Sequence, residues 1–133
     1  MKKRILIVDD EPDQVFTVQK SIEASSDEFE VFSATSGEQS IEFLQKHEPP
    51  DLILLDIMMP GMDGWELLNR IQENYKWSKI PVIFLTAKID DFTKTFARSV
   101  AMDFIEKPFE IHDLKKRIDF VLKKAYDLSI LEQ

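Results

Sequence analysis

The feature that most constrains the fold of this chain is an alternation of short apolar runs with longer amphipathic segments. The runs are rich in the β-branched and aromatic residues that favour strands, and they cover residues 5–8, 29–34, 52–55, 80–85 and 104–105. Strands separated by helices indicate a parallel sheet with right-handed crossovers and helices on both faces. The sequence therefore predicts a doubly wound α/β domain with five strands and five helices.

The segments between the runs carry apolar residues at helical spacing. Helices are expected after Pro12, after Ser36, near Gly64, after Asp90 and from Ile111 through Leu122. Ser36 and Gln39 have the form of a capping box. The positions expected to face the core are Val15, Val18, Ile22, Ile41, Leu44, Leu67, Leu68, Ile71, Phe92, Phe96, Leu114, Ile118, Val121 and Leu122. Beyond about Tyr126 the chain is interpreted as an extension of the last helix or as a frayed tail.

The composition of the runs indicates which strands lie in the middle of the sheet. Residues 5–8, 52–55 and 80–85 are apolar at every position, as expected for strands covered on both faces. The run at 29–34 lies in "EFEVFSA", which alternates charged with apolar residues, and the run at 104–105 is short and lies within the polar stretch "DFIEK". These two strands are therefore expected at the edges of the sheet.

Length and charge exclude several classes of partner. The chain has 133 residues, which fits one domain; we expect residues 1–126 to form it and 127–133 to be the tail or helix extension. A formal net charge of -8 argues against direct binding to nucleic acid or to an anionic membrane, which both attract basic surfaces. The first apolar run ends at "DDE", too early for a signal peptide, and no later run approaches a membrane span. A cytoplasmic location is expected.

Polar residues of complementary chemistry follow four of the strands. Asp9 and Asp10 follow the first run, and Asp56, Thr86 and Lys107 follow the third, fourth and fifth. The carboxyl ends of parallel strands meet at one edge of a sheet, so these side chains should converge there. Clustered carboxylates favour a hard cation such as Mg²⁺, while a hydroxyl and an ammonium suit phosphoryl oxygens. The pattern predicts a phosphoryl-transfer site with an Asp nucleophile.

Each residue also has an ordinary structural interpretation. The acids before Pro12 would suit the start of a helix, Asp56 could be a turn acid, Thr86 a loop hydroxyl and Lys107 a surface lysine. Four strand ends would then have to supply matching chemistry by accident. The functional interpretation is preferred for that reason.

Four motifs make the chain resemble the response-regulator receiver domain, the CheY-like phospho-acceptor of two-component signalling, over essentially its full length. They are "ILIVDDEP" (5–12), "LILLDIMMPGMDG" (52–64), "VIFLTA" (82–87) and "DFIEKPF" (103–109). The resemblance implies a five-stranded parallel sheet in the order 2-1-3-4-5, which agrees with the edge strands expected from composition. It also implies a cis peptide bond at Lys107–Pro108.

The resemblance further implies how the site is used. Asp56 would be phosphorylated by the phosphohistidine of a sensor histidine kinase, by a phosphotransfer protein or by a small phosphodonor. Asp10, Asp56 and the backbone carbonyl of Met58 would bind Mg²⁺ directly, and Asp9 would bind it through a water. Lys107 would pair with the acids at rest and with the phosphoryl group afterwards.

The switch residues implied by the resemblance are Thr86, its neighbour Ala87, and Phe104. Thr86 would move to the phosphoryl group and leave room for the ring of Phe104 to turn inward. The surface formed by the fourth helix, fifth strand and fifth helix would change as a result. Phe104 lacks the hydroxyl of the Tyr common at this position, so packing alone would hold the inward state.

Two further residues concern the lifetime of the phosphoryl group. Met58 lies two residues after Asp56, and Lys88 lies two residues after Thr86. Met58 cannot orient a water by hydrogen bonding, and Lys88 would shield the phosphoryl group or pair with it. Slow self-dephosphorylation is expected, although both residues also fit an exposed rim.

Other functions remain as alternatives. A Mg²⁺-dependent phosphatase would normally place a second acid where Met58 lies, and a flavodoxin-like electron carrier would need a phosphate loop in place of "DDEPDQ". A receiver-like module that binds partners without phosphorylation is a third. The chain is expected to be a stand-alone receiver, with an excised part of a larger regulator or hybrid kinase as the alternative. The resemblance also implies that a kinase docks on the first helix near the exposed positions around Gln14 and Val18, that phosphorylation can pair two copies, and that the output is read by a downstream protein effector.

Overall fold

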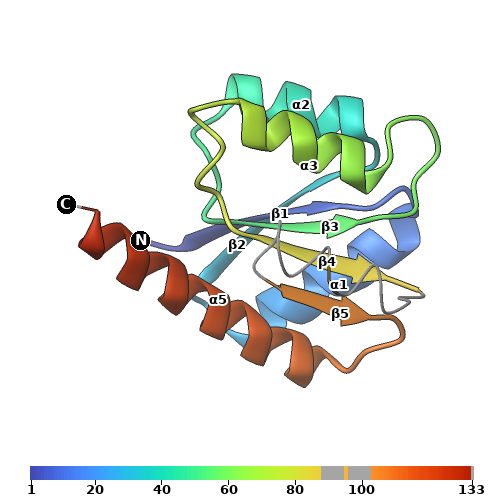
Figure 1. The fold of residues 1–133 in the computed structure, drawn as a ribbon. Coiled ribbons are helices and arrows are strands. Elements are labelled where there is room, and N and C mark those ends of the chain that lie inside the picture. The colour runs from blue at the N-terminus through green and yellow to red at the C-terminus, as the bar shows by residue number, and fades with distance from the viewer. Residues whose placement is uncertain (88–94, 96–102, 133) are drawn as a thin grey trace.

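A computed structural model of the chain describes residues 1–87, 95 and 103–132. Five parallel strands form one sheet in the order β2-β1-β3-β4-β5 (Figure 1). The strands are β1 Lys3–Val8, β2 Phe29–Ala34, β3 Leu52–Asp56, β4 Val82–Thr86 and β5 Asp103–Glu106. The expected order and the two expected edge strands are confirmed.

Four helices are formed within the described residues: α1 Pro12–Ser25, α2 Gly37–Lys46, α3 Gly64–Glu73 and α5 Ile111–Leu131. The helix expected after Asp90, with Phe92 and Phe96, lies outside them. Figure 1 shows α2 and α3 together on one face of the sheet and α1 and α5 on the other. None of these helices is both long and apolar enough to cross a membrane.

Alternate residues of the central strands supply two hydrophobic cores. In β3, Ile53 and Leu55 pack with Leu67 and Ile71 of α3, whereas Leu54 faces the opposite layer. That opposite core holds side chains of α1 and α5, namely Val15, Ile22, Leu114, Ile118 and Val121. Because both faces are covered, the runs at the centre of the middle strands are apolar, as the sequence indicated. Val18, Ile41 and Leu122 pack at the margins and are only partly buried.

The starts of α2 and α3 are fixed by side-chain caps. Ser36 Oγ accepts a hydrogen bond from the Gln39 backbone N–H at 3.1 Å, and Asp63 Oδ1 accepts one from the Glu66 N–H at 2.9 Å. The expected capping box forms only in part, because Gln39 Oε1 accepts from the backbone N–H of Thr35 at 2.8 Å. Gln39 thereby ties the end of β2 to α2.

Helix α5 is longer than its buried face requires. It continues to Leu131, so of the two outcomes expected beyond about Tyr126, an extension of the helix and a frayed tail, the extension is found over residues 127–131. Tyr126, Leu128 and Ile130 are exposed, so these turns pack little against the sheet. Apolar periodicity marked only the part of the helix that covers the core.

Candidate functional site

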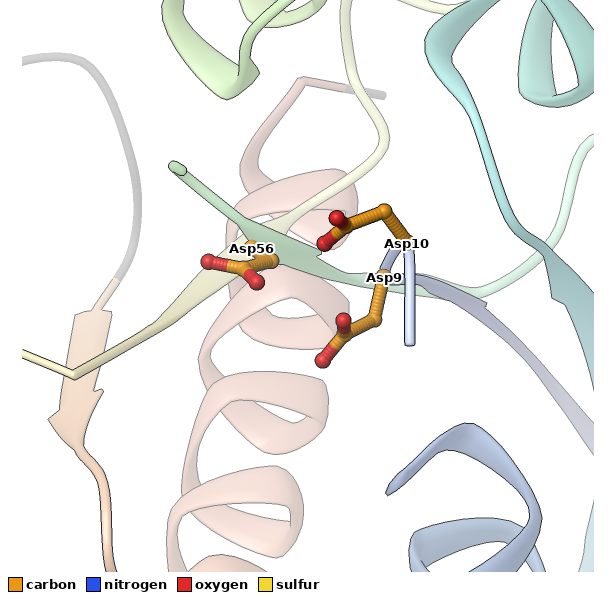
Figure 2. Close-up of side chains that lie close together, drawn as sticks. All are labelled: Asp9, Asp10 and Asp56. Atoms are coloured by element: carbon orange, nitrogen blue, oxygen red, sulfur yellow. The ribbon is translucent and has the colours of Figure 1, made fainter. Parts of the chain in front are cut away.

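The acidic residues meet at the carboxyl edge of the sheet because β1 and β3 are adjacent and in register. Val8 pairs with Leu55, so Asp9 follows β1 beside Asp56 at the end of β3. One carboxylate oxygen from each of Asp9, Asp10 and Asp56 lies within 4.8 Å of the others. Figure 2 shows these side chains gathered where the two strands end. The structure thus brings together the three acids that were expected to meet at the ends of the parallel strands.

The ammonium of Lys107 lies against this acidic cluster. Lys107 Nζ is 2.7 Å from Asp9 Oδ2, 2.9 Å from Gln14 Oε1 and 3.5 Å from Asp56 Oδ2. The lysine backbone is held as well, because its N–H donates to the carbonyl of Thr86 at 2.6 Å. The end of β5 thus delivers the cation to acids from β1 and β3.

Burial and charge act in opposite directions on Asp56. The side chain is only 8% exposed, and its burial raises the pKa of the carboxyl group. The charge of Lys107 and the hydrogen bond from the Met58 backbone N–H lower that pKa, while the neighbouring charge of Asp9 raises it again. The net effect is a raised pKa of Asp56. In the absence of a further cation, the folded protein therefore disfavours the ionised form of this side chain.

Lys107 experiences the complementary balance. Burial lowers the pKa of its ammonium, but the hydrogen bond to Asp9 and the charges of Asp56 and Asp9 together outweigh that effect. The pKa of Lys107 is therefore raised, and the side chain stays positively charged at neutral pH. A charged lysine can neutralise only one of the three nearby carboxylates.

Backbone groups fix the orientation of two carboxylates. The Glu11 N–H donates to Asp9 Oδ1 at 3.0 Å, and the Met58 N–H donates to Asp56 Oδ1 at 3.1 Å. Met58 itself projects outward with 72% of its surface exposed. Its backbone is thus tied to Asp56 while its side chain is exposed to solvent.

Close packing of α3 also constrains Asp56. The Gly64 N–H donates to the carbonyl of Ile57 at 2.9 Å. A Cβ atom placed on Gly64 would lie 2.6 Å from the carbonyl oxygen of Asp56. The first residue of α3 therefore has room for no side chain beside the backbone of Asp56.

The remaining expected site residues lie around this centre. Thr86 is buried at the end of β4, and Ala87 follows it in an exposed position. Phe104 is partly buried and packs against the core beneath α2 and α3. The Lys107–Pro108 peptide bond is cis. The expected rim residue Lys88 lies outside the described residues.

The donor set suits a hard divalent cation. The clustered ligand atoms are carboxylate oxygens, and His and Cys are absent from the cluster. Mg²⁺ prefers oxygen ligands and is commonly held by one or two carboxylates together with waters or phosphate oxygens. A divalent cation would also offset the negative charge that Lys107 leaves unbalanced. The residues present therefore fit Mg²⁺.

One contact of the site was not expected from the sequence. The sequence indicates for Gln14 only a place on the kinase-docking face of the first helix, but its side chain reaches Lys107. The two residues are separated by 93 positions, so no local spacing signals the contact. Only the packing of α1 beside the end of β5 brings them together.

Comparisons with known proteins agree on one family. Residues 5–119 match the family described as "Response regulator receiver domain". The chain is 37% identical over 134 residues to the response regulator GtcR of Aneurinibacillus migulanus, covering 100% of this chain and 53% of that protein. It is 33% identical over 126 residues to the alkaline phosphatase synthesis transcriptional regulatory protein PhoP of Bacillus subtilis (strain 168), covering 94% and 50%. The chain thus spans about half the length of these curated relatives.

A solved structure shares the fold. The signal receiver domain of a putative LuxO repressor protein from Vibrio parahaemolyticus superposes with a TM-score of 0.87 at 26% identity. The match covers 100% of this chain and 99% of that one. The similarity in sequence is therefore accompanied by the same arrangement of strands and helices.

Proposed function

The chain belongs to the response-regulator receiver domain family of two-component signalling, and from this premise we propose that it accepts a phosphoryl group on Asp56. The observation that carries the proposal is the meeting of Asp9, Asp10 and Asp56 with the ammonium of Lys107. Three acids and one cation gathered at a sheet edge have no structural need to be together. They suit a reaction that adds a further anion to the site.

In the proposed reaction, a carboxylate oxygen of Asp56 attacks the phosphorus of the donor. A P–O bond to Asp56 forms as the donor's P–N bond to histidine, or its P–O bond to a small leaving group, breaks. The product is an acyl phosphate, a mixed anhydride of the aspartate. The Met58 N–H, which donates to Asp56 Oδ1, leaves Oδ2 on the side of Lys107.

Mg²⁺ bound at the acidic cluster would supply electrostatic stabilisation of the charge on the transferring phosphoryl group. Asp10, Asp56 and the carbonyl of Met58 would hold the ion directly, and Asp9 through a water. Lys107, which follows β5, contributes a second positive charge beside Asp9 and Asp56. Its position beside Asp56 supports a role in binding a phosphoryl oxygen.

The phosphoryl group adds about two negative charges to the site, and we propose that Thr86 responds by moving toward this group. Its hydroxyl would move toward a phosphoryl oxygen, and Ala87 would move with it. Phe104, which packs at the margin of the core, would then turn inward. The outcome would be a changed surface around β5, α5 and the segment before β5, read by a partner.

The partners follow from this role. A sensor histidine kinase or phosphotransfer protein would supply the phosphoryl group in the cytoplasm, docking on α1 near Gln14 and Val18. Phosphorylation would also allow two copies to pair.

The lifetime of the phosphoryl group is proposed to be long. Met58 is exposed beside Asp56 and offers no group that could orient an attacking water. Lys88, two residues after Thr86, would shield the phosphoryl group or pair with it. Apart from its own phosphorylation and dephosphorylation, the chain would catalyse no reaction.

Incubation with acetyl phosphate and Mg²⁺, followed by intact-protein mass spectrometry, tests the proposal. The wild-type chain should gain the mass of one phosphoryl group, and Asp56→Asn should gain none. No gain in the wild type would overturn the proposal. Sustained release of free phosphate at many turnovers would instead indicate an Asp-nucleophile phosphatase.

A further inference from the structure

The ammonium of Lys107 has a third partner that is not an acid. Its Nζ lies 2.9 Å from the side-chain oxygen of Gln14 and 3.5 Å from Asp56 Oδ2. The hydrogen bond to the neutral amide is thus the shorter of the two. In this state the cation is drawn toward α1 and Asp9 and away from the proposed nucleophile.

Gln14 is itself held in place. Its Nε2 donates to Glu11 Oε2 at 2.9 Å, which turns the amide so that Oε1 faces Lys107. Pro12 begins α1 between these two residues, so the backbone that carries Gln14 is fixed at the first turn. The amide is therefore an oriented acceptor.

We propose that Gln14 is a positioning residue that holds Lys107 in the resting site and must release it for phosphorylation; this rests on the proposed function. An ammonium has three N–H donors, and Asp9, Gln14 and Asp56 occupy all three. A phosphoryl oxygen on Asp56 would take over the donor that now faces Asp56 Oδ2, and because that contact is the longest of the three at 3.5 Å, Lys107 Nζ must move toward Asp56 to bind it. Hydrogen bonds to charged acceptors are stronger than those to neutral ones, so the bond to Gln14 is the one given up.

The geometry also allows the contact to be removed without disturbing the core. Gln14 is exposed, and it lines a groove between α1 and the start of α5 together with Thr17, Phe109 and Ile111. Methionine has a helix propensity similar to that of glutamine and a similar length, but it lacks the carbonyl oxygen. Gln14→Met therefore removes the acceptor and preserves the helix.

The kinetic test compares Gln14→Met with the wild type and with Thr17→Ala, which alters the same groove away from Lys107. Phosphorylation by acetyl phosphate and Mg²⁺ should be about 5-fold faster in Gln14→Met, because the barrier no longer includes breaking the hydrogen bond between Gln14 and Lys107. The dephosphorylation rate should not change, because the contact is already broken in the phosphorylated state. Thr17→Ala should match the wild type in both rates. An unchanged or slower phosphorylation of Gln14→Met would overturn the proposal.

A second measurement does not depend on phosphorylation. In ¹⁵N NMR spectra of the metal-free chain, the hydrogen-bonded ammonium of Lys107 should give a signal protected from exchange with water. The signal should broaden in Gln14→Met and persist in Thr17→Ala; an identical signal in Gln14→Met would refute the contact. If the wild type takes up no phosphoryl group, the proposed function fails, while the spectra still decide whether Gln14 holds Lys107.

Discussion

Replacing Gly64 by alanine should damage the site through the backbone of Asp56. A Cβ atom at Gly64 would lie 2.6 Å from the Asp56 carbonyl oxygen and 2.7 Å from the Ile57 Cα, where ordinary contact begins at about 3.4 Å. The atoms that must move belong to the main chain, so no side-chain rotation can relieve the overlap. Either α3 or the end of β3 has to retreat by about 0.7 to 0.8 Å.

Two effects of different size follow from that displacement. Overpacking of this kind costs about 1–3 kcal/mol, so we expect the free energy of unfolding to fall by about 2 kcal/mol. Misplacement of a reacting group by 1 Å can cost about 100-fold in rate, so phosphorylation should slow by about 10-fold or more. Urea unfolding measures the first effect, and mass spectrometry of acetyl phosphate reactions measures the second.

Gly61→Ala provides the matched control. Gly61 has φ of 73°, and a Cβ atom there would meet nothing within 4 Å. Alanine in this left-handed backbone conformation should lower the free energy of unfolding by about 1–2 kcal/mol. Its Cβ atom would not contact Asp56. The two variants should therefore lose comparable stability, and only Gly64→Ala should lose phosphorylation rate. Wild-type stability and rate in Gly64→Ala would refute the inference that α3 packs rigidly against Asp56.

Further predictions concern the charges and the lifetime. In the metal-free chain, Lys107→Met leaves Asp9 and Asp56 without their shared cation, so the free energy of unfolding in urea at neutral pH should fall by about 1–3 kcal/mol; wild-type stability would contradict this. The pKa of Asp56 is higher in the folded protein than in the unfolded chain. The free energy of unfolding of the metal-free wild type should therefore fall as pH rises from the ordinary pKa of an aspartate to the raised one. Asp56→Asn should thus gain stability relative to the metal-free wild type across that window, and a relative loss would argue against burial as the cause. Met58→Asn should shorten the lifetime of the phosphoryl mass severalfold, because an amide can orient water; equal half-lives would exclude that role for Met58.

The strands could be predicted because burial on both faces leaves a direct mark on composition. Every residue of 52–55 is apolar, and β3 adds only Asp56 to that run. The start of β1 is different, because Lys3 and Arg4 are polar and yet pair with Phe29 and Glu30 of β2. Backbone pairing extends a strand past its buried part, and side-chain pattern does not report it.

The site was predictable as far as topology fixes it. Residues that follow parallel strands meet at one edge, which is why Asp9, Asp56 and Lys107 could be placed together. Gln14 could not, since its contact depends on the rotamer of a side chain on α1. The last turns of α5 carry exposed apolar residues and no buried face, so apolar periodicity could not decide there between an extension of the helix and a frayed tail.

The ion pair between Lys107 and Asp9 joins residues 98 positions apart. During synthesis the ends of β1 and β3, which carry Asp9 and Asp56, are made before Lys107, the lysine that faces them. A nascent chain, or a fragment that stops short of β5, therefore carries the acids without their cation. The capacity to accept a phosphoryl group would then appear only when β5 has been synthesised and has folded, so incomplete chains would not signal.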